Sequence, residues 1–346
     1  MRYVISTSAP DRGERGDAKV LRGKAIERRA ACLTSLDTAT ALVDAMVSGY
    51  DENNVELVDM AHLPREKRPV RFVKMHCGGN DFICIDSFMQ SPGDPASLAV
   101  ALCGRRRSVG GDGMILIERS DRADARMTLF DADGTRAPLG GNALRGVGKY
   151  LYEKLGVRKT ELSVETDDGP KLVRLFVRHG QVYAAETLLG TPDFTPENVP
   201  VLESGGIPVI KQYHSCGDWD EQITCLRLGD PQCVIVTDDC DGADVAAEGP
   251  LFEKAPLFPE GANVTFVSVI DRHTLRVRTW ERRIGETASC ATSVCAAAAV
   301  AQKLGLTEGN ETGVRTAGGL MTVHSTPEGM WLSGDAVMDF EGVVDV

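Results

Sequence analysis

Apolar and polar residues alternate over short segments along most of the chain from Val70 onward, and this pattern predicts β-strands. In the first part of this region the segments are VRFVKMH, DFICIDS, GMILIERS, ARMTLFDAD, LSVETD and KLVRLFVRHGQVYAAE. In the second part they are EQITCLRLG, QCVIVTDD, NVTFVSVID, TLRVRTWER, MTVHS and MWLSGDAV. One longer helical segment interrupts the strands near the middle of each part.

The two helical segments resemble each other. Residues 137–151, APLGGNALRGVGKYL, and residues 286–305, ETASCATSVCAAAAVAQKLG, both read as a loop followed by a helix. When one is placed on the other, Gly140 falls on Cys290 and Asn142 falls on Thr292. Strands repeated around a similar helix predict a duplicated α+β fold with a site between its halves.

The segment before Val70 differs from the rest. We expect a strand at residues 2–8, one or two helices between residues 16 and 50, and a strand at residues 53–60. A charged, proline-bounded linker follows at residues 63–69. The predicted domains are an N-terminal α/β extension of unknown role and two halves, the last strand being free to return to the first half. Their bounds are 1–69, 70–190 and 191–346.

Composition and charge exclude several classes of protein. The 346 residues include 38 basic and 50 acidic side chains, and a net charge of −12 argues against nucleic-acid binding. No apolar run is long enough to cross a bilayer and no basic segment precedes an apolar core at the N-terminus, so we expect neither a membrane span nor secretion. Ten cysteines without a CxxC pair indicate free thiols in a cytoplasmic protein and no metal site.

The start of each helical segment combines small and polar residues. Asn142 and Thr292 are residue types that cap helices, and the N–H groups of a first turn attract anions. Two such starts facing one pocket would hold a carboxylate from both sides, although ordinary capping explains either one alone. Cys290 lies at one start, where the helix dipole is expected to lower the pKa of its thiol. Glu281 and Arg282 precede it and are expected to orient a substrate.

Six segments in chain order carry a resemblance to a known family. They are VKMHCGGNDFICID (73–86), RRRSVGGDGMIL (105–116), FDADGTRAPLGGNALRGVGKYL (130–151), LGDPQCVIV (228–236), LFPEGANVTFV (257–267) and WERRIGETASCATSVCAAA (280–298). Over residues 71–346 the chain resembles the diaminopimelate epimerase family, whose racemases and epimerases use no pyridoxal phosphate. The resemblance implies two pseudo-symmetric, mainly-β halves, each wrapped around a central helix, with the active site in the cleft between them.

The resemblance also implies a reaction at the α-carbon of a small amino acid, with no cofactor and no metal. A thiolate removes the α-proton, an opposite thiol returns a proton to the other face, and the helix starts hold the α-carboxylate. By position, Cys290 is one of the two thiols, and we take Glu281 beside it as a second catalytic candidate. The implied substrate contacts are Asn80, Gly141, Asn142, Asn263, Glu281, Arg282, Ala291 and Thr292.

The chain departs from the family pattern inside this pocket. Gly140 stands where the second thiol belongs, and a glycine has no proton to give. Asp131 and Asp230, both expected to contact substrate, stand where the family has asparagines, and Cys77 stands where it has a glycine. Two added carboxylates predict a ligand with a cationic side chain in place of a distal carboxylate, unless Arg282 neutralises them.

These departures leave three functions open. The first is an epimerase or racemase acting on a diaminopimelate-like or cationic amino acid, with Cys290 as base. In this function Cys77 is a surrogate acid beside the gap that Gly140 leaves. The second is a one-base isomerase, or a β-eliminating lyase or dehydratase, because a single base cannot easily return a proton to the opposite face. The third is a non-catalytic amino-acid-binding protein. A homodimer is compatible with all three.

Overall fold

The chain divides after Glu66 into two compact units, Met1–Glu66 and Lys67–Val346. A computed structural model describes residues 3–6, 17–47, 67–137, 140–199, 201–202 and 205–346. Among the described helices, none has the length and apolar character that crossing a bilayer requires.

The smaller unit contains two short parallel strands and two helices. These are β1 (Tyr3–Ile5), α1 (Asp17–Glu27), β2 (Ala31–Leu33) and α2 (Leu36–Val47). The first predicted strand and both predicted helices are therefore confirmed. The strand predicted at residues 53–60 and most of the predicted linker lie outside the described residues.

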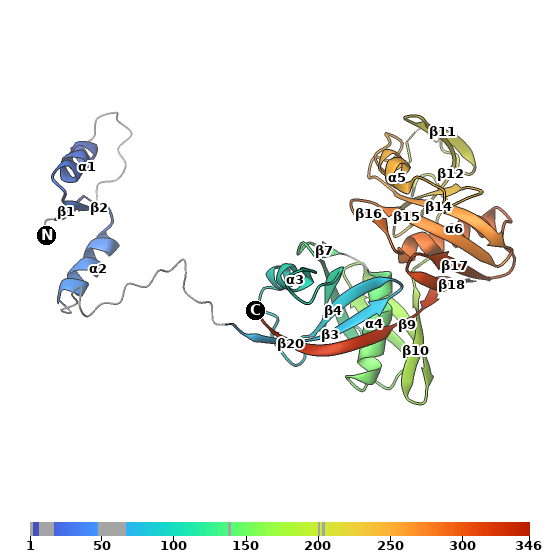
Figure 1. The fold of residues 1–346 in the computed structure, drawn as a ribbon, viewed down its shortest axis with the longest axis horizontal. Coiled ribbons are helices and arrows are strands. Elements are labelled where there is room, and N and C mark those ends of the chain that lie inside the picture. Colours follow the sequence, from blue (N-terminus) through green and yellow to red (C-terminus); the bar gives the residue numbers. More distant parts are fainter. Residues whose placement is uncertain (1–2, 7–16, 48–66, 138–139, 200, 203–204) are drawn as a thin grey trace. The chain divides into compact units, whose positions relative to one another are not determined.

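The first half of the larger unit is a curved sheet around one helix (Figure 1). Its strands pair in the order β20–β3–β4–β5–β6–β8–β9–β10, and the short β7 is attached to β6. Its elements are β3 (Pro69–Cys77), β4 (Asn80–Asp86), α3 (Pro95–Cys103), β5 (Gly113–Glu118), β6 (Ala125–Asp131), β7 (Arg136–Ala137), α4 (Gly141–Glu153), β8 (Glu161–Thr166), β9 (Gly169–Arg178) and β10 (Gln181–Leu188).

The second half repeats this arrangement. Its strands pair in the order β11–β12–β13–β14–β15–β17–β18–β19, with the short β16 attached to β15. Its elements are β11 (Gln212–Cys216), β12 (Trp219–Leu228), β13 (Asp230–Val236), α5 (Val245–Glu253), β14 (Asn263–Asp271), β15 (Thr274–Glu281), β16 (Gly285–Thr287), α6 (Ala291–Lys303), β17 (Glu311–Thr316), β18 (Gly319–Thr326) and β19 (Gly329–Gly334). The last strand, β20 (Val337–Asp345), pairs with β3 of the first half, and β10 pairs with β19.

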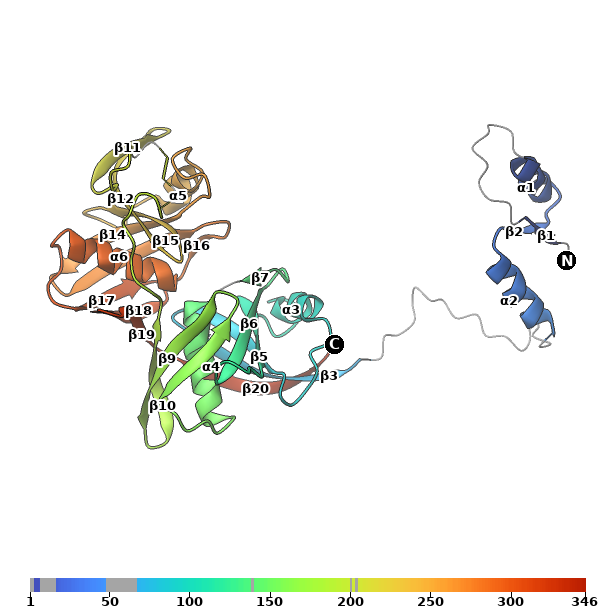
Figure 2. The same cartoon turned by 180° about the vertical axis from the view of Figure 1, so that it is seen from behind.

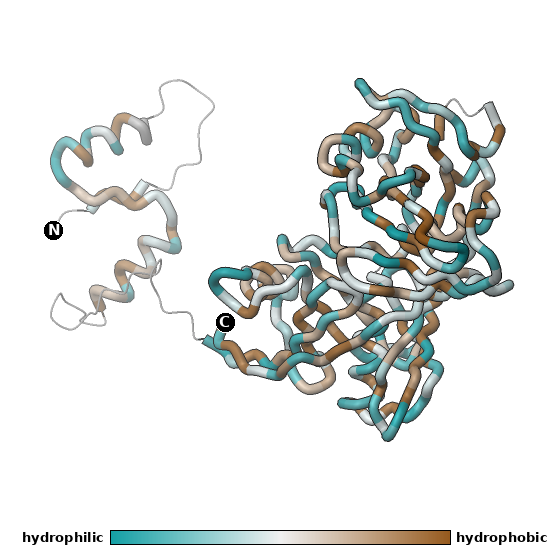
Figure 3. The backbone as a smooth tube through the Cα atoms, turned by 45° about the vertical axis from the view of Figure 1, so that its right-hand side comes forward, coloured by the Kyte–Doolittle hydropathy of each residue, from teal (hydrophilic) through white to brown (hydrophobic). Residues whose placement is uncertain are grey.

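The helices α4 and α6 lie at the centres of the two halves, as both views of the ribbon show (Figure 1 and Figure 2). Each is nearly completely buried, and each forms the middle of its own apolar core together with the inward faces of the strands. Apolar and polar stretches alternate along those strands (Figure 3), as expected where one face packs on a core and the other meets water. The predicted fold class is confirmed.

The two halves repeat with a constant offset in residue number. In the β5–β6 pair Met114 is opposite Phe130, and in the β14–β15 pair Val264 is opposite Trp280. The same offset relates the pairings β6–β7 and β15–β16, β6–β8 and β15–β17, and β8–β9 and β17–β18. The repeat that the sequence showed only at the helices therefore covers most of each half.

The shorter helices α3 and α5 follow this repeat as well. The side chain of Asp94 accepts a hydrogen bond from the first turn of α3, and Asp244, its equivalent at the same offset, does the same for α5. Sequence analysis missed both helices. At nine residues each, with weak helical periodicity, they give little signal against the strands around them.

Candidate active site

The starts of α4 and α6 meet between the halves. A Cβ atom placed on Gly141 would lie 2.6 Å from the Cβ of Ala291, so only a glycine fits there without displacing its neighbour. The residues before the helices, Gly140 and Cys290, share an extended backbone, with φ of −128° and −120°. Two first turns thus point at one small region, which is the geometry that a bound carboxylate requires.

Neither helix start is capped by a side chain. The N-cap residues are Gly140 and Cys290, and no side-chain oxygen accepts a hydrogen bond from either first turn. The expectation that Asn142 and Thr292 act as caps is therefore wrong, because both lie inside the first turn and bond elsewhere. The N–H groups of the first turns consequently have no side-chain cap competing with an anionic ligand.

The side chain of Asn142 ties the two halves together. Its amide nitrogen donates to Asn80 Oδ1 (2.7 Å) and to Ser289 Oγ (3.1 Å), and the Ser289 hydroxyl donates to the carbonyl of Gly78. Asn80 in turn donates to Asp112 (3.3 Å). The structure thus brings the predicted residues Asn80 and Asn142 together, and Asn142 links them to Ser289 of the second half.

A buried glutamine performs the corresponding task in the second half. Gln232 is fully buried, and its amide nitrogen lies 3.4 Å from Thr292 Oγ1. The hydroxyl of Ser293 donates to Gln232 Oε1 (3.0 Å). Sequence analysis did not select Gln232, Ser289 or Ser293. The available signal was the Asp-Pro-Gln block at 230–232, which also contains the predicted residue Asp230.

Cys290 and Glu281 form a buried pair. Cys290 is 8% exposed, its sulfur lies 3.3 Å from Thr292 Oγ1, and its side chain is hydrogen-bonded to the Glu281 carboxyl. The hydroxyl of Thr287 donates to Glu281 Oε1 at 2.5 Å. The thiol therefore sits between a helix start and a carboxyl group, as the catalytic assignment of both residues requires.

The expected lowering of the Cys290 pKa is wrong for the free protein. Burial, followed by the negative charge of Glu281, raises the pKa of the thiol to about 12, although hydrogen bonds from Ser293 and Thr292 oppose this. Burial likewise raises the pKa of Glu281, helped by the charges of Asp230 and Asp131. Desolvation is the largest influence on this pKa, and the resting thiol is protonated at neutral pH.

Asp230 and Arg282 form an ion pair at 2.5 Å, with side chains 46% and 19% exposed. The backbone N–H of Arg282 donates to Asn263 Oδ1 (2.8 Å), and its guanidinium also donates to the carbonyl of Glu260 (2.7 Å). The structure thus groups the predicted residues Asp230, Asn263 and Arg282. Arg282 neutralises Asp230, so its charge is already engaged when no ligand is bound.

Asp131 has no such partner. None of the ion pairs found among the described residues includes it. Its carboxyl is half-buried, and burial together with the charge of Asp133 raises its pKa. Its charge also contributes to the raised pKa of Glu281, which indicates that the two carboxyls share one region of the cleft.

The space beside Gly140 is filled. A Cβ atom placed on Gly140 would lie 2.6 Å from Leu129 Cδ2 and 3.1 Å from the Cβ of Ala143. The expected gap is therefore absent, because a leucine methyl group from β6 occupies the place of a side chain at position 140. This closes the space without supplying a proton donor.

Cys77 lies along the helix rather than at its start. Its sulfur would be 3.1 Å from a Cβ atom on Gly146, in the second turn of α4, and it is completely buried. Burial raises the pKa of its thiol to about 12, although the positive charge of Arg145 lowers it. Gly146 therefore leaves room for this sulfur in the core, and the observed packing gives Cys77 a structural role.

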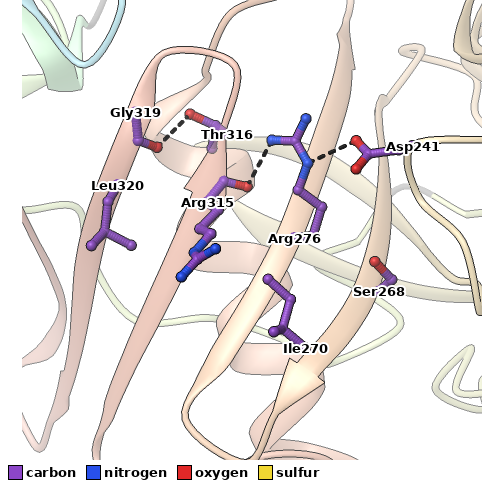
Figure 4. A pocket seen from close by; sticks show the side chains of 8 residues that line it. All are labelled: Asp241, Ser268, Ile270, Arg276, Arg315, Thr316, Gly319 and Leu320. Carbon is purple, nitrogen blue, oxygen red and sulfur yellow. Dashed lines mark hydrogen bonds and ion pairs between the residues drawn. The ribbon is translucent and has the colours of Figure 1, made fainter.

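A separate pocket of about 640 Å³ lies on the second half, against strands β14, β15, β17 and β18 (Figure 4). Arg276 bonds to Asp241 (2.8 Å) and to the carbonyl of Arg315 (3.4 Å) at one side of it, and the exposed side chains of Ile270 and Leu320 line it. No predicted site residue lines this pocket. Within the described residues, no cluster of three or more His, Cys, Asp or Glu side chains has metal-binding geometry.

Solved structures share the fold. A hydroxyproline epimerase from Agrobacterium vitis superposes with a TM-score of 0.61 and 16% identity, covering 82% of this chain and 94% of that chain. A probable proline racemase from Agrobacterium radiobacter K84 has a TM-score of 0.60 and 16% identity, covering 80% and 92%. Two halves that meet at paired helix starts therefore place the chain in the fold class of these epimerases and racemases.

Sequence comparison assigns the family. The family model for diaminopimelate epimerase matches residues 72–192 and 224–339. The diaminopimelate epimerase of Agathobacter rectalis is 35% identical over 285 residues, which are 80% of this chain and all of that protein. That of Acetivibrio thermocellus is 36% identical over 279 residues, covering 80% and 99%. The chain belongs to the diaminopimelate epimerase family and is an isomerase of the epimerase and racemase class.

Proposed function

We propose that this protein inverts the α-carbon of an amino acid and that Cys290 is the base on one face of that carbon. The observation that carries the proposal is the meeting of two uncapped helix starts beside the Cys290–Glu281 pair. The first-turn N–H groups of Gly141, Asn142, Ala291 and Thr292 hold the α-carboxylate. They also stabilise the negative charge that develops when the α-proton leaves.

Glu281 receives the thiol proton in this proposal. Cys290 is protonated in the free protein, so a base is needed before it can accept the α-proton. Glu281 is its hydrogen-bonded carboxyl, and its raised pKa makes it a better proton acceptor than an ordinary glutamate. The α-ammonium group of a substrate bound beside the carboxyls offsets their negative charge, which favours the thiolate.

The charges near the cleft favour a substrate with a cationic side chain. Asp131, Asp230 and Glu281 are three carboxyls, and Arg282 is the one cation shown to pair with any of them among the described residues. A side-chain carboxylate, as in diaminopimelate, has to draw Arg282 away from Asp230 before it gains a partner. A cationic side chain gains a carboxylate partner without breaking the Asp230–Arg282 ion pair.

The test is α-proton exchange in deuterated water with lysine, ornithine, arginine, histidine and diaminopimelate, followed by NMR and chiral analysis. We expect exchange with inversion, and we expect Cys290→Ala to abolish both. The matched control is Cys295→Ala, five residues along the same helix and fully buried, which keeps the activity. Exchange without inversion indicates the one-base isomerase or lyase. Binding without exchange, measured as a rise in melting temperature, indicates the binding protein.

The assembly and location of the protein are the remaining proposals. We propose a cytoplasmic enzyme that works on a small-molecule substrate, either as a single copy or as a homodimer. Light scattering during gel filtration separates these two states. Fractionation of the source cells tests the location, and recovery of the protein from a membrane fraction contradicts it.

A further inference from the structure

Asp131 occupies in the first half the position that Glu281 occupies in the second. Asp131 ends β6 and lies nine residues before Gly140, while Glu281 ends β15 and lies nine residues before Cys290. The registers of β5–β6 and β14–β15 are identical once the constant offset between the halves is applied. Each carboxyl therefore approaches its own helix start from the equivalent strand.

The surroundings of the two carboxyls differ in a consistent way. In the second half Glu281 is held by the Thr287 hydroxyl and by the Cys290 thiol. The equivalent residues in the first half are Ala137 and Gly140, which provide neither group. Asp131 is thus left without the partners that engage Glu281, and its carboxyl is available to a ligand.

The Leu129 side chain shows the direction in which Asp131 points. Leu129 lies two residues before Asp131 on β6, and residues two apart on a strand project from the same face. The Leu129 side chain reaches the place that a side chain at position 140 would occupy. Its equivalent in the second half is the smaller Thr279, which precedes Glu281 by two residues on β15. The face of β6 that carries Asp131 therefore borders the place of the missing thiol.

We propose that Asp131 is the acid and base on the face of the α-carbon opposite Cys290, in place of the thiol that Gly140 lacks. This inference rests on the proposed function and assigns its second catalytic residue. The Asp131 carboxyl meets the α-proton directly, whereas Glu281 acts on it through the Cys290 thiol. The charged groups that interact with Asp131 are Asp133 on its own turn and Glu281, which is itself influenced by Asp230, the partner of Arg282.

The proton balance closes without a further reactant. Glu281 first takes the Cys290 proton, so an S–H bond breaks and an O–H bond forms. The Cys290 thiolate then takes the α-proton, so the C–H bond breaks, an S–H bond forms, and the electron pair moves into the carbanion held at the helix starts. The protonated Asp131 carboxyl then gives its proton to the opposite face, so its O–H bond breaks and a new C–H bond forms. The enzyme is left with a thiol and a carboxylate, the protonation state that accepts the opposite enantiomer.

The decisive variant is Asp131→Asn, which replaces one carboxyl oxygen with an amide nitrogen and leaves the side-chain volume nearly unchanged. We expect the kcat for inversion to fall about 10²–10⁴-fold, the usual contribution of one general acid or base. The enantiomer whose α-proton faces Cys290 should still exchange that proton for deuterium with retention of configuration. A residue that only binds substrate would change KM, or would slow exchange and inversion together. The control is Asp121→Asn, an exposed aspartate away from the helix starts, which keeps the wild-type inversion rate.

A rescue experiment asks whether the missing group is a proton donor. In the Asp131→Asn background, Gly140→Cys provides a thiol and Leu129→Thr removes the methyl groups that occupy its place, leaving the residue type that Thr279 has at the equivalent position of the second half. We expect this triple variant to regain inversion, with melting temperature as the folding control. An Asp131→Asn variant that inverts at the wild-type kcat overturns the inference and leaves the proposed function intact. A wild-type protein that exchanges no α-proton overturns both.

Discussion

The contact between Leu129 and position 140 predicts a strong coupling between two substitutions. In Gly140→Cys, the new Cβ atom lies 2.6 Å from Leu129 Cδ2, closer than real Cβ atoms approach, so the leucine has to move. Leu129 is 6% exposed and packs in the core around α4, where it has little room. Overpacking of this kind costs about 1–3 kcal/mol of the free energy of unfolding.

The second substitution, Leu129→Thr, is destabilising alone and compensating in combination. It removes buried methyl groups, and we expect a cost of about 2–4 kcal/mol from lost burial and an unfilled cavity. When Gly140→Cys is also present, the thiol fills that cavity and the close contact disappears. The double variant should therefore be more stable than the sum of the single costs by about 1–3 kcal/mol.

The assay is a double-mutant cycle on the full chain, with the free energy of unfolding taken from urea titration followed by fluorescence. Thermal melting provides a second measure, since 1 kcal/mol corresponds to about 2–4 °C for a unit of this size. Single costs that add within about 0.5 kcal/mol would refute the packing argument. They would show that the leucine leaves position 140 without resistance, and that the space beside the glycine is open after all.

Three other measurements test the charges of the site. Glu281→Gln should stop turnover and speed the alkylation of Cys290 by iodoacetamide by about 5- to 10³-fold, because the negative charge of Glu281 disfavours the thiolate. A charge at about 4 Å has an effect of about 1–4 kcal/mol. Equal or slower labelling contradicts the pairing of Glu281 with Cys290. In the wild type, the rate of Cys290 labelling should rise about tenfold per pH unit from pH 7 to pH 10 with no plateau, because burial raises the pKa of its thiol to about 12. A plateau near neutral pH would show instead that the pKa of the thiol is lowered. Asp230→Asn should free Arg282 and shift thermal stabilisation from lysine-like ligands toward diaminopimelate; an unchanged ligand order refutes the charge argument.

Most strands and both central helices could be predicted from the sequence because their signals are local. Alternation of period two marks the strands, and the loop–helix match marks the helices. The equivalence of Asp131 and Glu281 could not be found this way. It depends on the identical pairing registers of β5–β6 and β14–β15, which become visible only when the strands are assembled.

The sequence predicted which residues form the candidate site, and this remains a prediction; it did not predict their electrostatics and packing. A cysteine at a helix start suggests a reactive thiol, yet burial raises the pKa of Cys290 by more than the hydrogen bonds from Ser293 and Thr292 lower it. A glycine in place of a thiol suggests a gap, yet Leu129 from another strand fills it. Gln232 on β13 contacts Thr292 in the first turn of α6. Each of these effects arises from packing between different strands and helices, which no local sequence pattern reports.

The differences between the two halves argue for adaptation rather than loss of function. Loss of a thiol alone would leave a cavity and an uncatalysed face. In the first half Leu129 occupies the space beside Gly140, Ala137 offers no hydroxyl where the second half has Thr287, and Asp131 places there an ionisable group that no ion pair among the described residues engages. Random drift in an inactive protein has no reason to close the space and also leave a free carboxyl at its border. The same three changes are what a direct carboxyl acid requires once the thiol at position 140 is gone.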